Sequence, residues 1–137
     1  MEKGYKILLM DDEEDVRIIL QELLELLGYQ VVACENGDEV IEVYQETLNT
    51  KDKFDIVILD LTIRGGKGAI ETIQELKEID PNVKSLLISG YSVDNKVMDN
   101  YQDFGFSEKV EKPFQILEIK DKLSNIIKKE CEACNAR

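Results

Sequence analysis

Histidine is absent from the 137 residues of the sequence, and cysteine occurs only three times, at Cys34, Cys131 and Cys134. The lack of histidine excludes serine–histidine and cysteine–histidine nucleophilic pairs and histidine–metal sites. An odd number of cysteines and the lack of a signal peptide favour a reducing cytosol over a disulfide framework. Cys131 and Cys134 form a lone C-x-x-C pair. We therefore interpret residues 130–137 as a polar C-terminal tail rather than as a metal or redox site.

Basic residues are also scarce. Lysine and arginine number 17 against 29 aspartates and glutamates, which gives a formal net charge of -12 at pH 7. Such acidity opposes tight binding of nucleic acid by this chain alone, and it suits cations and basic partner surfaces. No apolar run approaches the length that crosses a bilayer. We therefore expect a cytoplasmic chain with no membrane contact, folded as a single domain.

Strand-like segments alternate with helical patterns along the chain. The last strand-like segment is short and charged, so we place it at an edge of the sheet. The alternation predicts βαβ units with right-handed crossovers and a parallel sheet with helices on both faces. We expect the α/β, flavodoxin-like (βα)5 doubly wound form of this sheet, whose strand order is 2-1-3-4-5. The predicted strands cover residues 5–10, 30–34, 54–60, 83–89 and 108–112, and the predicted helices cover residues 16–27, 40–48, 70–79, 93–104 and 114–127.

Asp60 is the single carboxylate that ends the third predicted strand, directly after four apolar residues, Ile56 to Leu59. Ligands of open parallel sheets bind beyond the carboxyl ends of the strands. Asp11 and Asp12 end the first predicted strand, which the predicted order places beside the third. We therefore expect three carboxylates to converge in one crevice. Clustered carboxylates repel one another unless a cation neutralises them, and Mg²⁺ suits such oxygen ligands.

Ser89 and Lys112 end the two neighbouring strands, so we expect both to face the same crevice. A hydroxyl, an ammonium and a metal ion around one carboxylate form a site that can receive an anion. Phosphoryl transfer needs little more than an in-line nucleophile and positive charge around the phosphoryl oxygens. This pattern predicts that Asp60 is a nucleophile that forms an aspartyl phosphate.

Four short motifs stand in order at the ends of the predicted strands. With them, the chain from Lys6 to Lys129 resembles the receiver domains of two-component response regulators, and it is most similar to receivers associated with hybrid sensor histidine kinases. On this resemblance, residues 1–129 are the receiver domain. The motifs are Leu9-Met10-Asp11-Asp12-Glu13, Leu59-Asp60-Leu61-Thr62, Ile88-Ser89-Gly90 and Lys112-Pro113-Phe114.

The resemblance implies that Asp60 accepts phosphate from a sensor histidine kinase or a histidine phosphotransfer protein. It also implies that Ser89 and Lys112 contact the phosphoryl group, and that the chain catalyses only its own phosphorylation and slow dephosphorylation. No output domain is expected in this chain, and the face of the last strand and last helix could form a homodimer. The implied Mg²⁺ ligands are the side chains of Asp11, Asp12 and Asp60 and the main-chain carbonyl of Thr62.

Three positions modify this expectation. Receivers commonly carry an aromatic residue three positions before the lysine, where this chain has Lys109. An ammonium does not bury as a ring does, so we expect weaker coupling of the site to the surface of the last strand. Thr62 and Tyr91 flank the path of the hydrolytic water in this family. Neither carries a carboxamide or a carboxylate to orient that water, so a long-lived aspartyl phosphate is expected.

Other classes of protein remain as alternatives. A Mg²⁺-dependent aspartate phosphohydrolase of the haloacid dehalogenase type would want a second acid two residues after Asp60, and that position is Thr62. A flavodoxin-like binding module would need a loop rich in serine, threonine and glycine after the first strand, where acids stand instead. A degenerate receiver that serves only as a docking module is the third alternative.

Overall fold

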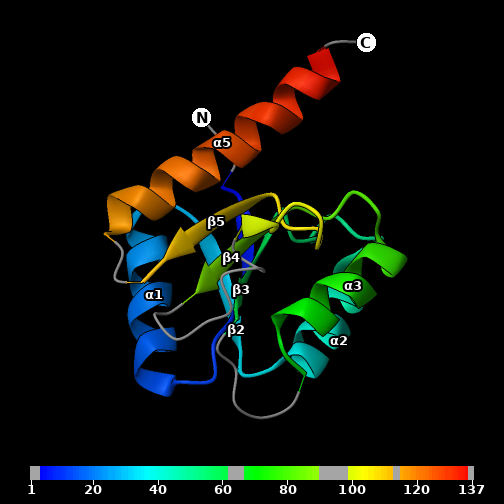
Figure 1. The fold of residues 1–137 in the computed structure, drawn as a ribbon. Helices are drawn as coiled ribbons and strands as arrows, with labels where there is room; N and C mark the ends of the chain where they lie inside the picture. Colours follow the sequence, from blue (N-terminus) through cyan, green and yellow to red (C-terminus); the bar gives the residue numbers. More distant parts are fainter. Residues whose placement is uncertain (1–3, 62–66, 90–98, 113–114, 136–137) are drawn as a thin grey trace.

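Five parallel strands form one sheet in the order β2-β1-β3-β4-β5, which confirms the predicted topology (Figure 1). The computed structural model describes residues 4–61, 67–89, 99–112 and 115–135. Each strand pairs in parallel with its neighbours, and Leu9 of β1 lies opposite both Ala33 and Ile58. The strands are β1 (Lys6–Met10), β2 (Gln30–Cys34), β3 (Ile56–Asp60), β4 (Ser85–Ser89) and β5 (Glu108–Glu111).

The helices begin and end where local sequence signals stand. The side chain of Asn36 caps the second helix by accepting the N–H of Glu39 at 3.1 Å. The first helix is followed by Gly28, whose φ of 100° favours glycine. Residues 93–98 of the helix predicted over residues 93–104 fall outside the described residues, and residues 100–104 form turns instead of a helix. The described helices are α1 (Glu14–Leu26), α2 (Gly37–Thr47), α3 (Ala69–Ile79) and α5 (Ile116–Asn135).

Helix α5 continues to Asn135, well beyond the predicted end at residue 127. The backbone of residues 130–135 therefore continues this helix. The interpretation of residues 130–137 as a polar C-terminal tail stays a prediction. The division of the chain at residue 129 stays a prediction. Within the described residues, no helix is long and apolar enough to cross a membrane.

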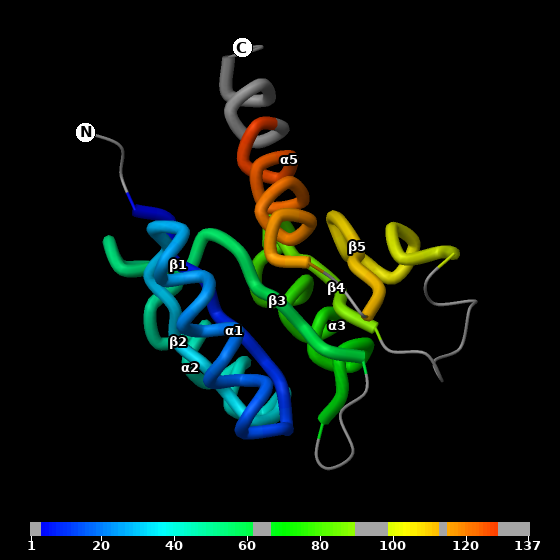
Figure 2. The backbone as a smooth tube through the Cα atoms, turned by 90° about the vertical axis from the view of Figure 1, so that its left-hand side faces the viewer, coloured from blue at the N-terminus to red at the C-terminus, as the bar shows by residue number. Residues whose placement is uncertain are grey.

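Two hydrophobic clusters fill the two faces of the sheet. Helices α2 and α3 cover one face, and α1 and α5 cover the other (Figures 1 and 2). Successive residues of β3 point to opposite faces, so Val57 and Leu59 join the first cluster, whereas Ile56 and Ile58 join the second. Burial of both faces explains why this strand is apolar throughout. Asp60, the polar residue that ends β3, therefore stands at the carboxyl end of the central strand of a tightly packed sheet.

Candidate functional site

The carboxyl ends of β1, β3, β4 and β5 bring four of the predicted residues to one edge of the sheet. Asp11 directly follows β1, and Lys112 directly follows β5. Asp60 and Ser89 are the last residues of β3 and β4, and both are 2% exposed. The backbone N–H of Lys112 donates to the carbonyl oxygen of Ser89 at 2.7 Å. This hydrogen bond continues the sheet by one residue and fixes where the lysine side chain starts.

Asp60 and Lys112 form an ion pair. The Nζ of Lys112 donates to Oδ2 of Asp60 at 2.8 Å, although 52 residues separate them in the sequence. Partial burial lowers the pKa of Lys112, but the hydrogen bond and the charge of Asp60 outweigh it, so the pKa lies above its ordinary value. Lys112 is therefore a permanent cation at neutral pH.

Asp11 is buried beside Asp60. Its Oδ1 accepts the backbone N–H of Glu13 at 2.9 Å. Burial raises the pKa of Asp11 to about 7; the hydrogen bond from Glu13 opposes this shift, and the charge of Asp60 adds to it. Two carboxyl groups thus share the neighbourhood of one ammonium. This is an arrangement in which an additional cation would be favoured.

One oxygen of this pair is suited to a metal ion. Oδ2 of Asp11 is buried and has no hydrogen-bond partner in the described part of the protein. An unpaired carboxylate oxygen next to a second carboxylate offers the hard oxygen ligands that Mg²⁺ prefers, so these residues fit such an ion. Asp12 is half-buried at the start of the loop. However, residues 4–61, 67–89, 99–112 and 115–135 contain no group of three or more acidic, histidine or cysteine side chains arranged to hold a metal.

The structure brings Asp11 and Asp60 together. That Asp12 joins them as a third carboxylate stays a prediction. The carbonyl of Thr62 and the side chain of Tyr91 lie outside the described residues.

Lys109 occupies the middle of β5. It is half-buried, and its Nζ lies 5.3 Å from the centroid of the Tyr101 ring. This distance is within the range of a cation–π interaction. The ring of Tyr101 lies against the end of this side chain. The position that is usually aromatic in receivers thus holds a cation against an aromatic partner.

Sequence reasoning missed Arg17. Its Nη1 donates to the carbonyl oxygen of Asp11 at 2.9 Å, and its Nη2 lies 3.7 Å from Glu35. Arg17 thereby ties the loop after β1 to the first turns of α1 and to the end of β2. One signal could have identified it, because Arg17 is the only cation in α1, a helix that begins with acids.

Comparison with known proteins agrees with this arrangement. A family model described as the response regulator receiver domain matches residues 7–124. The chain is 33% identical over 116 residues to sporulation initiation phosphotransferase F of Bacillus subtilis, covering 85% of this chain and 88% of that protein. It is 31% identical over 126 residues to chemotaxis protein CheY of Thermotoga maritima, covering 91% of this chain and 99% of that protein.

Solved structures give the same picture. A response regulator receiver domain protein from Clostridium thermocellum shares the fold with a TM-score of 0.82 at 23% identity, over 94% of this chain and 98% of that one. The response regulator TrrA from Thermotoga maritima, solved in complex with Mg²⁺-BeF, has a TM-score of 0.75 at 29% identity, over 89% of this chain and 98% of that one. The narrower similarity to receivers of hybrid kinases stays a prediction.

Proposed function

The chain belongs to the response regulator receiver domain family, and we propose that Asp60 is its phosphoacceptor. Receivers are signalling modules. The observation that carries the proposal is the pairing of a buried strand-end carboxylate with Lys112 at 2.8 Å, beside the second carboxyl group of Asp11. The donor we propose is the phosphohistidine of a sensor histidine kinase or of a histidine phosphotransfer protein.

The chemistry is a displacement at phosphorus. A carboxylate oxygen of Asp60 attacks the phosphorus atom, an O–P bond forms, and the P–N bond to the donor imidazole breaks. The imidazole leaves with the electron pair of that bond and takes up a proton. The ammonium of Lys112 contacts Asp60 before the attack, and its charge afterwards stands beside the new phosphoryl oxygens. Ser89, at the end of the neighbouring strand, would donate its hydroxyl to one of these oxygens.

The residues around Asp60 would hold Mg²⁺ for this reaction. We propose that Asp11, Asp12 and Asp60 do so together with the carbonyl of Thr62, and the support from this structure is the unpaired buried oxygen of Asp11. When bound, the ion neutralises the negative charge that the phosphoryl group brings to a site already rich in carboxylates. Without that neutralisation, a dianionic group would be repelled by the acids at the entrance.

The consequence of phosphorylation would be a change of shape that a partner detects. We propose that the face of β5 and α5 conveys this change and that this face can also form a homodimer. Acidity makes a basic partner surface the better match, and nucleic acid a poor one. We also propose that the chain works in the cytoplasm and makes no contact with a membrane.

Intact mass spectrometry tests the phosphoacceptor directly. Incubation with acetyl phosphate and Mg²⁺ should add one phosphate, and Asp60→Asn should abolish the addition because the amide is a poor nucleophile. Asp52→Asn is the matched control, since Asp52 is exposed and lies outside the site. Undiminished phosphorylation of Asp60→Asn would contradict the assignment, whereas loss in both variants would point to a general effect of charge.

A further inference from the structure

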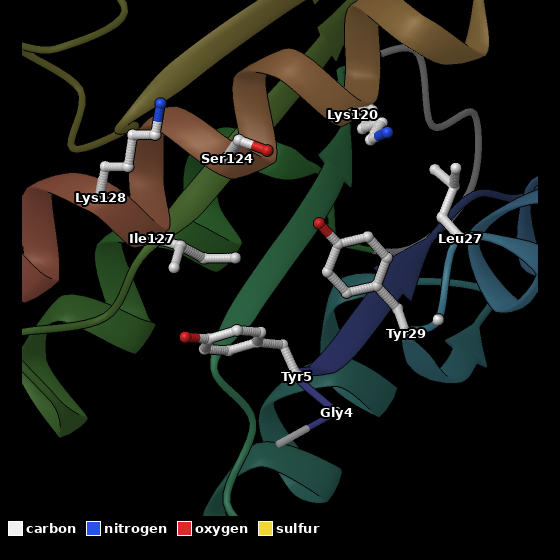
Figure 3. A pocket seen from close by; sticks show the side chains of 9 residues that line it. Gly4, Tyr5, Leu27, Tyr29, Lys120, Ser124, Ile127 and Lys128 are labelled. Atoms are coloured by element: carbon white, nitrogen blue, oxygen red, sulfur yellow. The ribbon is translucent and has the colours of Figure 1, made fainter. Parts of the chain in front are cut away.

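A cavity of about 620 Å³ lies at the edge of the sheet opposite to Asp60 (Figure 3). Its walls come from the start of β1, from the turn between α1 and β2, and from α5. Its volume falls in the range of roughly 300–1,000 Å³ that is typical of sites for small molecules. The strand ends that carry the proposed phosphoacceptor site take no part in it.

Two tyrosines form the aromatic wall of the cavity. Tyr5 and Tyr29 are half-buried, and both rings lie across from the α5 residues Ser124 and Ile127 (Figure 3). Burial, and next the nearby phenol of Tyr5, raise the pKa of Tyr29 above its ordinary value, so the phenol stays protonated at neutral pH. This wall therefore offers flat ring surface together with a hydroxyl that can donate a hydrogen bond.

The charged residues that line the cavity in the described part of the chain are all of one sign. They are Lys120 and Lys128, in a chain where acids outnumber bases by 29 to 17. Ser124 lies between the two lysines on the same side of α5, since the three are spaced by four residues. In the described portion of the chain, neither lysine forms an ion pair with a carboxylate. Lys120 and Lys128 are both exposed, so their ammonium groups can reach an anion in the cavity.

We propose that this cavity binds a small aromatic molecule that carries an anionic group, of about the size of a nucleoside monophosphate. The ring packs against Tyr5 and Tyr29, and the anionic group is held by Lys120, Lys128 and the hydroxyl of Ser124. A bound molecule would connect α5 to the start of β1 and to the turn before β2. It would thereby tie the last helix of the domain to the amino-terminal edge of the sheet.

Titration of the full chain with AMP, followed by amide NMR in the absence of Mg²⁺, tests this proposal. Adenosine and inorganic phosphate are titrated in parallel. AMP should produce saturable shifts at Tyr5, Tyr29 and Ser124, with an affinity at least about fivefold higher than that of either fragment, because each fragment keeps only part of the contacts. The absence of saturable shifts at these residues with millimolar AMP would overturn the proposal, as would equal affinity for phosphate alone.

Two double variants separate local charge from net charge. Lys120→Gln/Lys128→Gln should weaken AMP binding about tenfold or more, because charge-assisted contacts are lost. Lys51→Gln/Lys53→Gln removes the same charge from an exposed loop and should leave the affinity unchanged. An equal loss in both would show that only the overall charge attracts the anion, and it would overturn the site.

The aromatic wall has its own test. Tyr29→Leu keeps apolar bulk but removes the ring and its hydroxyl, so the affinity for AMP should fall to that of phosphate; an unchanged affinity would overturn the role of the ring.

The site is also independent of phosphorylation. Asp60→Asn should bind AMP with wild-type affinity, and Lys120→Gln/Lys128→Gln should be phosphorylated on Asp60 by acetyl phosphate as in the wild type. Failure of one proposal is therefore distinguishable from failure of the other.

Discussion

Two carboxyl groups and one ammonium lie together in the buried part of the site, so their charges do not cancel when all are ionised. Asp11 relieves part of the imbalance, because burial moves its pKa to about 7 and a fraction of it is protonated near neutral pH. The Nζ of Lys112 contacts Oδ2 of Asp60 at 2.8 Å. The reactivity of Asp60 should therefore depend on the charge of this lysine.

Replacement of this lysine tests that dependence. Lys112→Met keeps the length of the side chain and removes the charge, and it should slow phosphorylation by acetyl phosphate about a hundredfold, a loss typical of removing one group that stabilises developing charge. Circular dichroism should show an unchanged fold. Lys51→Met, at an exposed position, is the control. Wild-type kinetics in Lys112→Met would show that the pair observed here does not assist the reaction.

At the scale of the elements, β5 differs from the usual receiver pattern. The ammonium of Lys109 lies over the ring of Tyr101. The carboxylate Oε1 of the neighbouring Glu108 lies 3.4 Å from Nζ of Lys122 in α5. The cation–π contact is worth about 0.5–1 kcal/mol at such a partly exposed site. Because nothing requires this contact to differ between the two states of the site, it adds little free energy to a switch.

Hydrogen exchange measures the switching of β5. Phosphorylation should change the exchange of amides over Glu108–Glu111 only slightly in the wild type. Lys109→Tyr should enlarge the change, because a ring can turn between exposed and buried positions. Lys109→Met removes the charge without adding a ring and should resemble the wild type. A large change at these amides in the wild type would indicate that another device couples β5 to the site.

One part-buried hydrogen bond links helix α2 to the residue that follows α3. The hydroxyl of Tyr44 donates to Oδ2 of Asp80 at 2.7 Å. Burial, followed by the hydrogen bond and charge of Asp80, raises the pKa of Tyr44. A group whose pKa is raised by folding stabilises the folded state below its unfolded pKa, which is about 10 for tyrosine, and loses that contribution as the pH rises further.

Tyr44→Phe should therefore lower the free energy of unfolding by about 1 kcal/mol near neutral pH. Above about pH 10 the difference in free energy of unfolding between Tyr44→Phe and the wild type should shrink. The phenol then ionises in the unfolded chain but not beside the negative charge of Asp80, and this destabilises the folded wild type. Urea denaturation at several pH values measures both effects. Asp80→Asn provides a double-mutant cycle, in which the two substitutions together should cost less than their sum. Strict additivity would show that the bond contributes nothing.

At the scale of the whole molecule, one sheet separates two hydrophobic clusters, and all of the site residues stand at one end of that sheet. Because β1, β2, β3 and β4 each contribute side chains to both clusters, the domain should unfold as one unit. A ligand that binds only the folded arrangement of strand ends then stabilises the entire domain. The net charge of -12 makes a cation the natural ligand of this kind.

Mg²⁺ should accordingly raise the free energy of unfolding, by about 2.7 kcal/mol at about 100 times its Kd. Asp12→Ala should lose most of this increase. Glu22→Ala, an exposed acid on α1, should retain it. Thermal denaturation with and without the ion gives the comparison. An equal gain in both variants would mean that the ion acts on the overall charge and not at the proposed site.

The sequence by itself determined the fold and the identity of the strand ends. Runs of apolar residues and helical spacing are local features, and they predicted the parallel sheet, its strand order and the positions of Asp60 and Ser89 at the ends of β3 and β4. The boundaries were less accurate. Helix α5 runs to Asn135. The sequence of residues 130–135 has no apolar spacing, so it could not mark where the helix ends.

Only the tertiary structure decided which side chains meet. Lys112 reaches Asp60 across 52 residues, Arg17 reaches back to the carbonyl of Asp11, and Lys109 lies against Tyr101. Each contact depends on how helices and loops pack on the sheet, which no periodicity records. The same holds for the unpaired oxygen of Asp11 and for the cavity between α5 and the start of β1. Burial and free volume exist only once distant segments of the chain have come together.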